Sequence, residues 1–347
     1  MHTTWDSAGF RAGVEQTLQD FVAGQARWLD ELGEDAQRLV QHASRSVSGG
    51  KRFRAAFCWW GHQAVAPPTE DAALLRACAA LELLHASALV HDDYMDASDV
   101  RRGRPATHRA FEQLHRESGW NASAEQYGAA AAILLGDLLL SWSDEMLRTC
   151  GLPAEGVLAA LSYLDRTRSE VVTGQFLDVS AQARGNVDVD TAMTVLRYKS
   201  AKYSIERPLN LGAALAGASA ATQDQLSRFG LPLGEAFQLR DDLLGVFGDP
   251  EATGKPAGDD LSEGKRTVLV ALALDALSAT DRKRLDTALG TTLSPPEVDE
   301  LRGLIERSGA REQVEQVISE LTRRAVTALD AADIDGHART VLRELAD

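Results

Sequence analysis

One stretch of this chain, residues 82–104, limits its possible folds more than any other. The first half of the stretch is apolar with helical spacing, so that Leu84, Ala88 and Asp92 fall on one face of a helix. Asp96 continues that line one turn further on. The spacing therefore predicts a long helix whose apolar face ends in carboxylates.

These carboxylates indicate a cation site. Asp92, Asp93 and Asp96 are close enough in sequence to repel one another unless a positive ion lies between them. Ligand sets made only of carboxylates favour a hard ion, and Mg²⁺ often shares its shell between one or two carboxylates and substrate phosphates. The arginines that follow add positive charge suited to phosphate oxygens: Arg101, Arg102 and Arg104. A solvated acidic helix end followed by a basic loop is the ordinary alternative.

A second aspartate pair favours the interpretation as a site. Asp241 and Asp242 lie in a later helical stretch, and a loop rich in glycine, proline and charge follows over residues 248–260. Long polar loops in helical domains are more often functional than idle. Lys255 and Lys265 give this loop the capacity to bind phosphate. Two such patterns in one chain make the ordinary alternative the weaker one.

A basic cluster precedes both aspartate motifs. Gly49 and Gly50 allow the backbone to bend closely around a ligand. Lys51, Arg52 and Arg54 then gather where the next helix is expected to start, although cations are unfavourable at that end of the helix dipole. Their placement suggests an anionic ligand, with a solvated basic turn as the alternative.

Two further polar pairs are weaker candidates. Gln175 and Asp178 lie on adjoining positions of one helix face and could simply form an interhelical hydrogen bond. Lys199, next to Ser200, lies among apolar and small residues and could either extend to the surface or point at the anion.

Composition predicts an all-helical protein that does not bind nucleic acid. Leucine and alanine dominate, and no stretch alternates with a period of two residues. Lys and Arg total 36 against 51 Asp and Glu, so the net charge of −15 repels nucleic acid and anionic membranes. Any phosphate ligand must therefore be held by local cations.

The cysteine pattern and the lengths of the apolar runs favour a cytoplasmic protein without a transmembrane segment. The cysteines Cys58, Cys78 and Cys150 have no metal-ligand spacing and are odd in number, so we expect reduced core residues in a reducing compartment. No apolar run is expected to span a bilayer, since even residues 129–142 are interrupted by Asp137.

The chain is expected to form one domain. Residues 1–10 have the composition of a flexible N-terminal arm, and amphipathic helical spacing begins at about Arg11. No interdomain linker, internal repeat or low-complexity tract follows. We therefore expect a single domain over residues 11–347.

Eight motifs occur in a fixed order over most of the chain, from about residue 40 to residue 270. They are Gly49-Gly50-Lys51-Arg52-x-Arg54, His85, Asp92-Asp93-x-x-Asp96, Arg101-Arg102-Gly103, Gln175-x-x-Asp178, Lys199-Ser200, Gln238-x-x-Asp241-Asp242 and Gly264-Lys265-Arg266-Thr267. Together they closely resemble the motifs of the trans-isoprenyl diphosphate synthases, also called polyprenyl synthetases, and most of all those of geranylgeranyl diphosphate synthases.

The resemblance implies a fold and a reaction. The fold would be an all-α, isoprenoid-synthase-type bundle of antiparallel helices around a central apolar cavity, with the aspartate motifs facing each other at its mouth. The reaction would ionise an allylic diphosphate (dimethylallyl, geranyl or farnesyl) with three Mg²⁺ ions. The double bond of isopentenyl diphosphate would then attack the cation, and proton loss would leave a trans chain longer by five carbons.

The resemblance also implies roles for individual residues. The metal ligands would be Asp92, Asp96 and Asp241, with Asp93 and Asp242 in support. The residues holding isopentenyl diphosphate would be Lys51, Arg54, His85 and Arg102. The residues holding the allylic diphosphate would be Arg101, Gln175, Lys199, Lys255 and Lys265. The residues acting in the chemical step would be Asp92, Asp93, Asp96, Lys199, Ser200, Gln238 and Asp241. Among these, Lys199, Ser200 and Gln238 would stabilise the developing cation through oriented oxygen dipoles.

The chain departs from the family pattern at two positions. Gly245 stands where many members have a third aspartate in the second motif, and Ser200 stands where many have threonine. The hydroxyl survives at Ser200. At Gly245 we expect weakened metal affinity at most, because Asp241 still supplies a contact.

The helix before Asp92 should set the product length, because each turn of about 5.4 Å is comparable to one isoprene unit. Members that stop early have aromatic residues four or five positions before the first aspartate, where this chain has Ala88 and Ser87. Leu84 and Leu81, one and two turns deeper, are then the first candidates for a floor. This pattern favours geranylgeranyl over farnesyl diphosphate, and longer products remain an alternative.

Other functions are compatible with parts of the pattern. A class I terpene cyclase also uses an aspartate-rich helix and Mg²⁺, but it has no need of the second diphosphate site that the residues 49–54 and Arg102 indicate. A non-catalytic partner subunit generally loses aspartates or basic residues, which this chain keeps. The resemblance also implies a homodimer.

Overall fold

Helices make up nearly all of this computed structural model, which describes residues 5–185, 188–249 and 258–346. Within these ranges the only sheet is a hairpin of β1 (Val100–Arg101) and β2 (Arg104–Pro105), which pair antiparallel. The predicted all-α fold class is therefore confirmed.

The chain divides into two compact units. Unit 1 contains Met1–Leu161 and Leu211–Gly217, and unit 2 contains Ser162–Asn210 and Ala218–Asp347. The elements of unit 1, besides the hairpin, are α1 (Ser7–Leu29), η1 (Asp30–Leu32), α2 (Glu34–Val47), α3 (Phe53–Gln63), α4 (Asp71–Met95), α5 (Thr107–Glu117) and α6 (Ala124–Arg148). Two helices have residues in both units: α7 (Ala154–Arg184) and α9 (Arg207–Leu215). The single domain expected over residues 11–347 stays a prediction.

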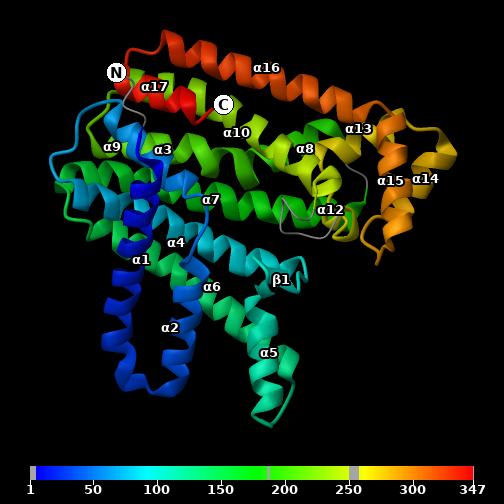
Figure 1. The fold of residues 1–347 in the computed structure, drawn as a ribbon, viewed down its shortest axis with the longest axis horizontal. Helices are drawn as coiled ribbons and strands as arrows, with labels where there is room; N and C mark the ends of the chain where they lie inside the picture. The colour runs from blue at the N-terminus through cyan, green and yellow to red at the C-terminus, as the bar shows by residue number, and fades with distance from the viewer. Residues whose placement is uncertain (1–4, 186–187, 250–257, 347) are drawn as a thin grey trace. The chain divides into compact units, whose positions relative to one another are not determined.

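The helices of unit 2 surround a second apolar core. They are α8 (Val189–Leu196), η2 (Arg197–Glu206), α10 (Ala220–Phe247), α12 (Asp259–Ser262), α13 (Val268–Ala276), α14 (Ala279–Ala288), α15 (Pro295–Arg307), α16 (Ala310–Ala331) and α17 (Gly336–Glu344). The long helix α10 packs along α16 and along η2, and it continues through the buried Pro232 (Figure 1). The buried apolar residues of α10, α13, α15 and α16 form one cluster.

The first helix begins earlier than the sequence suggested. The N-cap Asp6 accepts a hydrogen bond from Gly9 N at 2.8 Å, so α1 starts at Ser7 and includes the last four residues of the predicted arm. Phe10 lies edge-on to Trp59, with ring centroids 5.6 Å apart. Aromatic packing against α3 therefore holds this segment in place. Residues 1–4 of the arm lie outside the described residues.

The helix predicted before Asp92 is α4, and it forms the core of unit 1. It packs against α1, α2, α3, α5 and α6. Its length and apolar composition would suffice to cross a membrane, so the expectation that no run reaches that length was wrong. Since 72% of its apolar window is buried inside the protein, α4 has the properties of a core helix.

His42 is the titratable group at the contact between α2 and α5. Its ring lies 4.4 Å from the ring of Phe111, measured between centroids. Burial, and then the nearby Arg45 guanidinium, lower the pKa of His42 from 6.5 to about 4. The imidazole is therefore neutral in the folded protein at pH values where an unfolded chain would protonate it.

The position of His42 predicts an acid-sensitive contribution to stability. Because the folded-state pKa is the lower one, this contribution is present above pH 6.5 and is lost as the pH falls towards about 4. The variant His42→Phe keeps a ring against Phe111 and removes the titration. Its free energy of unfolding in urea should fall less than that of the wild type over this range. His337→Gln, at an exposed histidine, should behave as the wild type, and parallel curves for all three proteins would contradict the prediction.

Candidate active site

The C-terminal end of α4 presents the first aspartate motif. Asp93 is buried, whereas Asp92 and Asp96 are half-buried. Asp96 is the C-cap residue, and its backbone N–H donates to Asp92 O at 2.8 Å. Asp92 and Asp96 therefore lie one turn apart at the helix end, as the sequence predicted.

Asp93 is held by an ion pair with Arg101. The Arg101 Nε–H donates to Asp93 Oδ1 at 2.8 Å, and Arg101 Nη2 donates to the same oxygen. Burial raises the pKa of Asp93, and Arg101 opposes that rise. Arg101 was predicted to bind the allylic diphosphate, but in this structure its guanidinium forms an ion pair with the buried carboxylate of Asp93.

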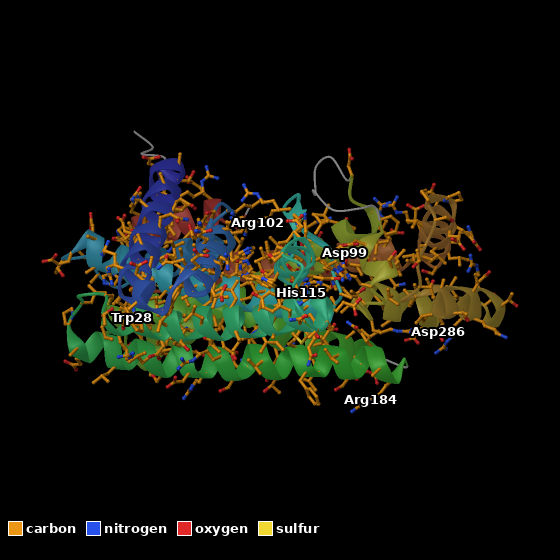
Figure 2. The ribbon with its side chains drawn as sticks, turned by 90° about the horizontal axis from the view of Figure 1, so that it is seen from below. Trp28, Asp99, Arg102, His115, Arg184 and Asp286 are labelled. Atoms are coloured by element: carbon orange, nitrogen blue, oxygen red, sulfur yellow. The ribbon has the colours of Figure 1, made fainter. Side chains whose placement is uncertain are left out.

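The hairpin carries the next arginine, Arg102, which is labelled in Figure 2. Arg102 has φ +52°, a left-handed conformation that is uncommon for a residue with a Cβ atom. Its guanidinium donates to Ser48 O at 2.5 Å. A Cβ atom added to Gly50 would lie 3.1 Å from Arg102 Nη2, so glycine gives the guanidinium room. Two motifs that are about fifty residues apart in sequence thus meet within unit 1.

The basic cluster after the glycines separates into two kinds of residue. Arg52 is buried and forms ion pairs with Glu82, at 3.2 Å, and with Glu15. It anchors the loop and is not available to a ligand. Lys51 is exposed, with its ammonium 5.6 Å from the ring centroid of Phe53, and Arg54 is half-buried. The charge pattern by itself does not separate these three residues, because only tertiary burial distinguishes them, whereas the family resemblance had already left Arg52 out of the ligand set.

His85 lies among the arginines of unit 1. Burial lowers its pKa well below 6.5, and the guanidinium groups of Arg54 and Arg102 lower it further. His85 is therefore neutral near pH 7 and can offer a hydrogen bond but no charge. The structure thus brings together three of the four residues predicted to hold isopentenyl diphosphate, and Lys51 follows the adjoining glycine loop.

The residues predicted to set product length differ in their surroundings. Leu81 and Leu84 are buried in α4, and Ala88 is half-buried. Ser87 is also buried, and its hydroxyl donates to Gly136 O of α6 at 2.7 Å. A serine that bonds to the backbone of α6 is still a small side chain, so the assignment of Ser87 and Ala88 to the chain-length pocket stays a prediction.

In unit 2 the Lys199-Ser200 motif lies on a π-helical segment, η2, which sequence periodicity did not indicate. Two helix backbones approach η2 closely. A Cβ atom on Gly174 of α7 would lie 2.4 Å from Lys199 N, and one on Gly234 of α10 would lie 2.4 Å from Ala201 O. Glycine is thus required on both sides of the segment. These two residues were missed, since a glycine within a helix has no motif of its own.

Lys199 points to the end of the Gln175-x-x-Asp178 motif. Its Nζ lies 2.6 Å from Asp178 Oδ2. Gln175 Nε2 is buried and has no hydrogen-bond partner among the residues that the structure describes. Asp178 of the predicted pair therefore does form an interhelical hydrogen bond, with Lys199 of η2, whereas the amide nitrogen of Gln175 forms none among the described residues.

A hydrogen-bonded chain links η2 to the second aspartate motif. Ser200 Oγ donates to Gln238 Oε1, and Gln238 Nε2 donates to Asp242 Oδ1 at 2.7 Å. Burial, and then the neighbouring Asp260 carboxylate, raise the pKa of Asp242 to about 8. Asp241, the predicted metal ligand, is exposed on the same helix.

Asp260 is a carboxylate that the sequence reasoning missed. A Cβ atom on Gly245 would lie 1.9 Å from Asp260 Oδ2, so the glycine makes room for this side chain from α12. Lys265 Nζ lies 3.2 Å from Asp260 Oδ1 and also pairs with Glu263. Lys265, predicted to bind diphosphate, is thus paired with carboxylates in this structure. Lys255 lies outside the described residues.

The carboxylates suit a Mg²⁺ ion whose coordination is completed by a bound phosphate ligand better than a metal ion coordinated by protein side chains alone. No three His, Cys, Asp or Glu side chains are grouped to hold a metal ion within the described ranges. Burial is the main cause of the raised pKa of Asp242, and the neighbouring Asp260 and Asp241 carboxylates add to it; a bound cation would offset the effect of these carboxylates. Carboxylate oxygens with the remaining ligands supplied by phosphate are the donor set that Mg²⁺ prefers.

Comparison with known proteins identifies the family of this chain. The profile of the Polyprenyl synthetase family matches residues 36–306. A short chain isoprenyl diphosphate synthase of Methanothermobacter thermautotrophicus is 34% identical over 87% of this chain and 86% of its own length. A geranylgeranyl diphosphate synthase of Mycobacterium tuberculosis is 34% identical over 84% of this chain and 79% of its own length. The crystal structure of geranylgeranyl pyrophosphate synthase from Corynebacterium glutamicum, complexed with isoprenyl diphosphate and magnesium, aligns with a TM-score of 0.95 and 41% identity over 98% of each chain.

The chain therefore belongs to the polyprenyl synthetase family and is a trans-prenyltransferase. Other relatives are named for geranylfarnesyl and farnesyl diphosphate, so the names of the relatives do not fix one product length.

The glycine contacts at η2 predict a sensitive position for catalysis. In Gly174→Ala, the added methyl group would meet the backbone of Tyr198 and Lys199 at 2.5 and 2.4 Å, and overpacking of this kind costs about 1–3 kcal/mol. Displacement of Lys199 should lower prenyl transfer by at least about tenfold. The measurement is the steady-state rate beside the thermal midpoint. Thr173→Ala, one residue away and exposed, should match the wild type. Full activity of Gly174→Ala would show that η2 tolerates displacement.

Proposed function

We propose that this protein condenses isopentenyl diphosphate with allylic diphosphates and releases a trans-polyprenyl diphosphate; the favoured product is geranylgeranyl diphosphate, with farnesyl or a longer-chain diphosphate as the alternative. The observation that carries the proposal is the end of α4. There a buried aspartate-arginine pair fixes a hairpin, and the hairpin sets Arg102 against the loop of Gly49 and Gly50. This arrangement supports the proposal because carboxylates of α4 and cations that could bind phosphate lie close together in unit 1.

Isopentenyl diphosphate is assigned to the cations of unit 1. Lys51 and Arg54 follow the glycine loop, and Arg102 contacts that loop from the hairpin. Guanidinium groups bind phosphate oxygens in a fixed geometry, and the exposed ammonium of Lys51 can reach the same diphosphate. Neutral His85 donates a hydrogen bond without adding to the repulsion among these cations. The glycines allow the backbone N–H groups to approach the anion closely.

The allylic diphosphate is assigned to Arg101, Gln175, Lys199, Lys255 and Lys265. The carboxylates Asp92, Asp96 and Asp241 would hold three Mg²⁺ ions, with Asp93 and Asp242 in support. When bound, Mg²⁺ neutralises the charge of the diphosphate and makes it a better leaving group. Lys199, oriented by Asp178, adds a fixed positive charge.

The chemical step leaves a carbocation that the chain must stabilise and keep from water. The Ser200 and Gln238 oxygens are fixed by the hydrogen bond between them, so their dipoles need no reorganisation as positive charge develops. Attack by the double bond of isopentenyl diphosphate forms the new carbon–carbon bond. Inorganic diphosphate and one proton leave, and the product is five carbons longer.

We also infer a cytoplasmic homodimer. The three cysteines are free and buried, as expected in a reducing compartment. Ile133 and Leu134 of α6 are 45% and 59% exposed, and such apolar side chains offer a surface for a second copy. A terpene cyclase or a non-catalytic partner subunit is disfavoured because the chain keeps both the residues assigned to isopentenyl diphosphate and its aspartates. The direct test is incubation of the purified chain with Mg²⁺, isopentenyl diphosphate and each allylic primer, with product length determined by mass spectrometry.

Removal of one carboxylate from either motif should abolish most of the activity. Asp92→Ala and Asp241→Ala should each reduce turnover by orders of magnitude, because each variant loses a proposed Mg²⁺ ligand. Circular dichroism should be unchanged. Asp224→Ala, which removes an exposed carboxylate paired with Arg228 on the same α10 helix, is the matched control and should keep wild-type turnover. Near-normal rates in either motif variant would refute the assignment.

The length of the product should respond to Ala88. A phenyl ring at this half-buried position of α4 would close the apolar path one turn above Leu84. Ala88→Phe should therefore shorten the product, as determined by mass spectrometry after dephosphorylation. Ala88→Ser changes little volume and should leave the length unaltered. An unchanged product from Ala88→Phe would mean that the chain grows along another wall.

A further inference from the structure

The π-helical segment η2 is held at both of its ends by ion pairs that no assigned role uses. Arg197 is the first residue of η2, and its Nε–H donates to Glu235 Oε1 of α10 at 2.6 Å. Arg207 directly follows the last residue of η2 and pairs with Glu170 of α7. All four residues belong to unit 2. The segment is therefore connected to α10 at its start and to α7 at its end.

The pair at the end of η2 has a two-point geometry. Arg207 Nε donates to Glu170 Oε2 at 2.7 Å, and Arg207 Nη2 donates to Glu170 Oε1 at 2.6 Å. Such a pair fixes the orientation of both groups as well as their separation. Lys202, within η2, donates to Glu170 Oε1 at 3.1 Å and adds a third contact.

Glu170 is charged in this arrangement. Burial raises the pKa of its carboxyl group, but hydrogen bonds and positive charge from Arg207 and Lys202 outweigh that effect and hold the pKa below its ordinary value. Glu170 is therefore a carboxylate near pH 7, and one anion holds two cations of the neighbouring segment.

The pair at the start of η2 includes a buried carboxylate. The side chain of Glu235 is 7% exposed, whereas Arg197 is half-buried. A carboxylate taken out of water needs a cation beside it, so this pair opposes displacement of η2. Glu235 also follows Gly234, the glycine that allows α10 to approach Ala201 of η2.

The ion pair of α7 continues the helix face that contacts the Lys199-Ser200 motif. Glu170, Gly174 and Asp178 follow one another at intervals of four residues and so lie on one face of α7. Gly174 approaches the backbone of Lys199, and Asp178 accepts from its Nζ. Glu170 is thus the third contact of this face with η2.

The ion pair of α10 lies in the same way on a face that the site uses. Glu235, Gln238 and Asp242 follow one another at intervals of three and four residues. Gln238 accepts from Ser200 Oγ and donates to Asp242. The contacts assigned to catalysis and the two ion pairs therefore belong to the same two helix faces.

The conformation of η2 gives these ion pairs a role. The π-helix is rare in proteins and often occurs at functional sites, which indicates that surrounding contacts must support it. We propose that Glu170 and Glu235 are positioning residues, which hold η2 in its π-helical form and thereby orient the Lys199-Ser200 motif. This inference rests on the proposed function, which assigns Lys199 to the allylic diphosphate.

The kinetic test uses Glu170→Gln and Glu235→Gln, which keep the shape of each side chain and remove its charge. Both variants should lower kcat at least about tenfold and raise KM for geranyl diphosphate, because the polar groups of η2 lose their orientation. KM for isopentenyl diphosphate should stay unchanged, since the residues assigned to it lie in unit 1. Asp165→Asn and Asp224→Asn alter exposed ion pairs on the same helices, α7 and α10, and are the matched controls.

Hydrogen exchange followed by mass spectrometry tests the position of η2 in the free protein. Peptides over residues 197–206 should exchange faster in both variants, and the two controls should exchange as the wild type. Arg197→Gln removes the same ion pair through its more exposed partner, and it takes the place of Glu235→Gln if that variant does not fold.

The outcomes separate this inference from the proposed function. Wild-type exchange over residues 197–206 in the folded variants would overturn the inference, as would faster exchange with unaltered kcat and KM for geranyl diphosphate. A lower kcat with both KM values unchanged would indicate loss of folded protein and would also count against it. A wild type without prenyl transfer, whose variants nevertheless exchange faster, would contradict the proposed function alone.

Discussion

The buried carboxylate of Asp93 is the constraint on which the organisation of unit 1 depends. A carboxylate taken out of water at the end of α4 must find a cation, and Arg101 supplies it from the hairpin. That pair fixes where the hairpin turns, and the left-handed Arg102 then reaches Ser48 of the glycine loop. The Asp93–Arg101 pair and the contact of Arg102 with Ser48 thus connect a helix end, a hairpin and a loop.

In unit 2 the main constraint is the placement of a short polar segment, η2, between two long helices. The π-helical η2 is wider than an α-helix, and glycines at 174 and 234 let α7 and α10 approach it. Close approach brings Lys199 to Asp178 and Ser200 to Gln238. The polar groups are positioned by backbone packing, and their own hydrogen bonds then fix the orientation of each side chain.

Sequence periodicity predicted helices well where the spacing of apolar residues alone decides the structure. The apolar spacing before Asp92 became α4, because a helix apolar on most sides has to be buried. Burial within a cluster was not predictable: Arg52 and Arg54 look equivalent in sequence, yet Arg52 is enclosed by Glu15 and Glu82. Nor does the sequence indicate that the hydroxyl of Ser87 bonds to the Gly136 carbonyl of α6. These differences arise from partners distant in sequence.

The effect of Gly245, which differs from the family pattern, also depends on a residue distant in sequence. Counted along α10, the second motif lacks a third carboxylate, and the sequence alone predicts a weaker site. In space, Asp260 of α12 occupies the volume that a side chain at 245 would need, and its charge helps to raise the pKa of Asp242. The number of carboxylates around the motif is therefore a property of the fold and cannot be counted from the spacing. Lys265, which follows α12, pairs with the same Asp260. The electrostatic environment of Asp242 on α10 therefore depends on both Asp260 and Lys265, and a movement of either residue would change it.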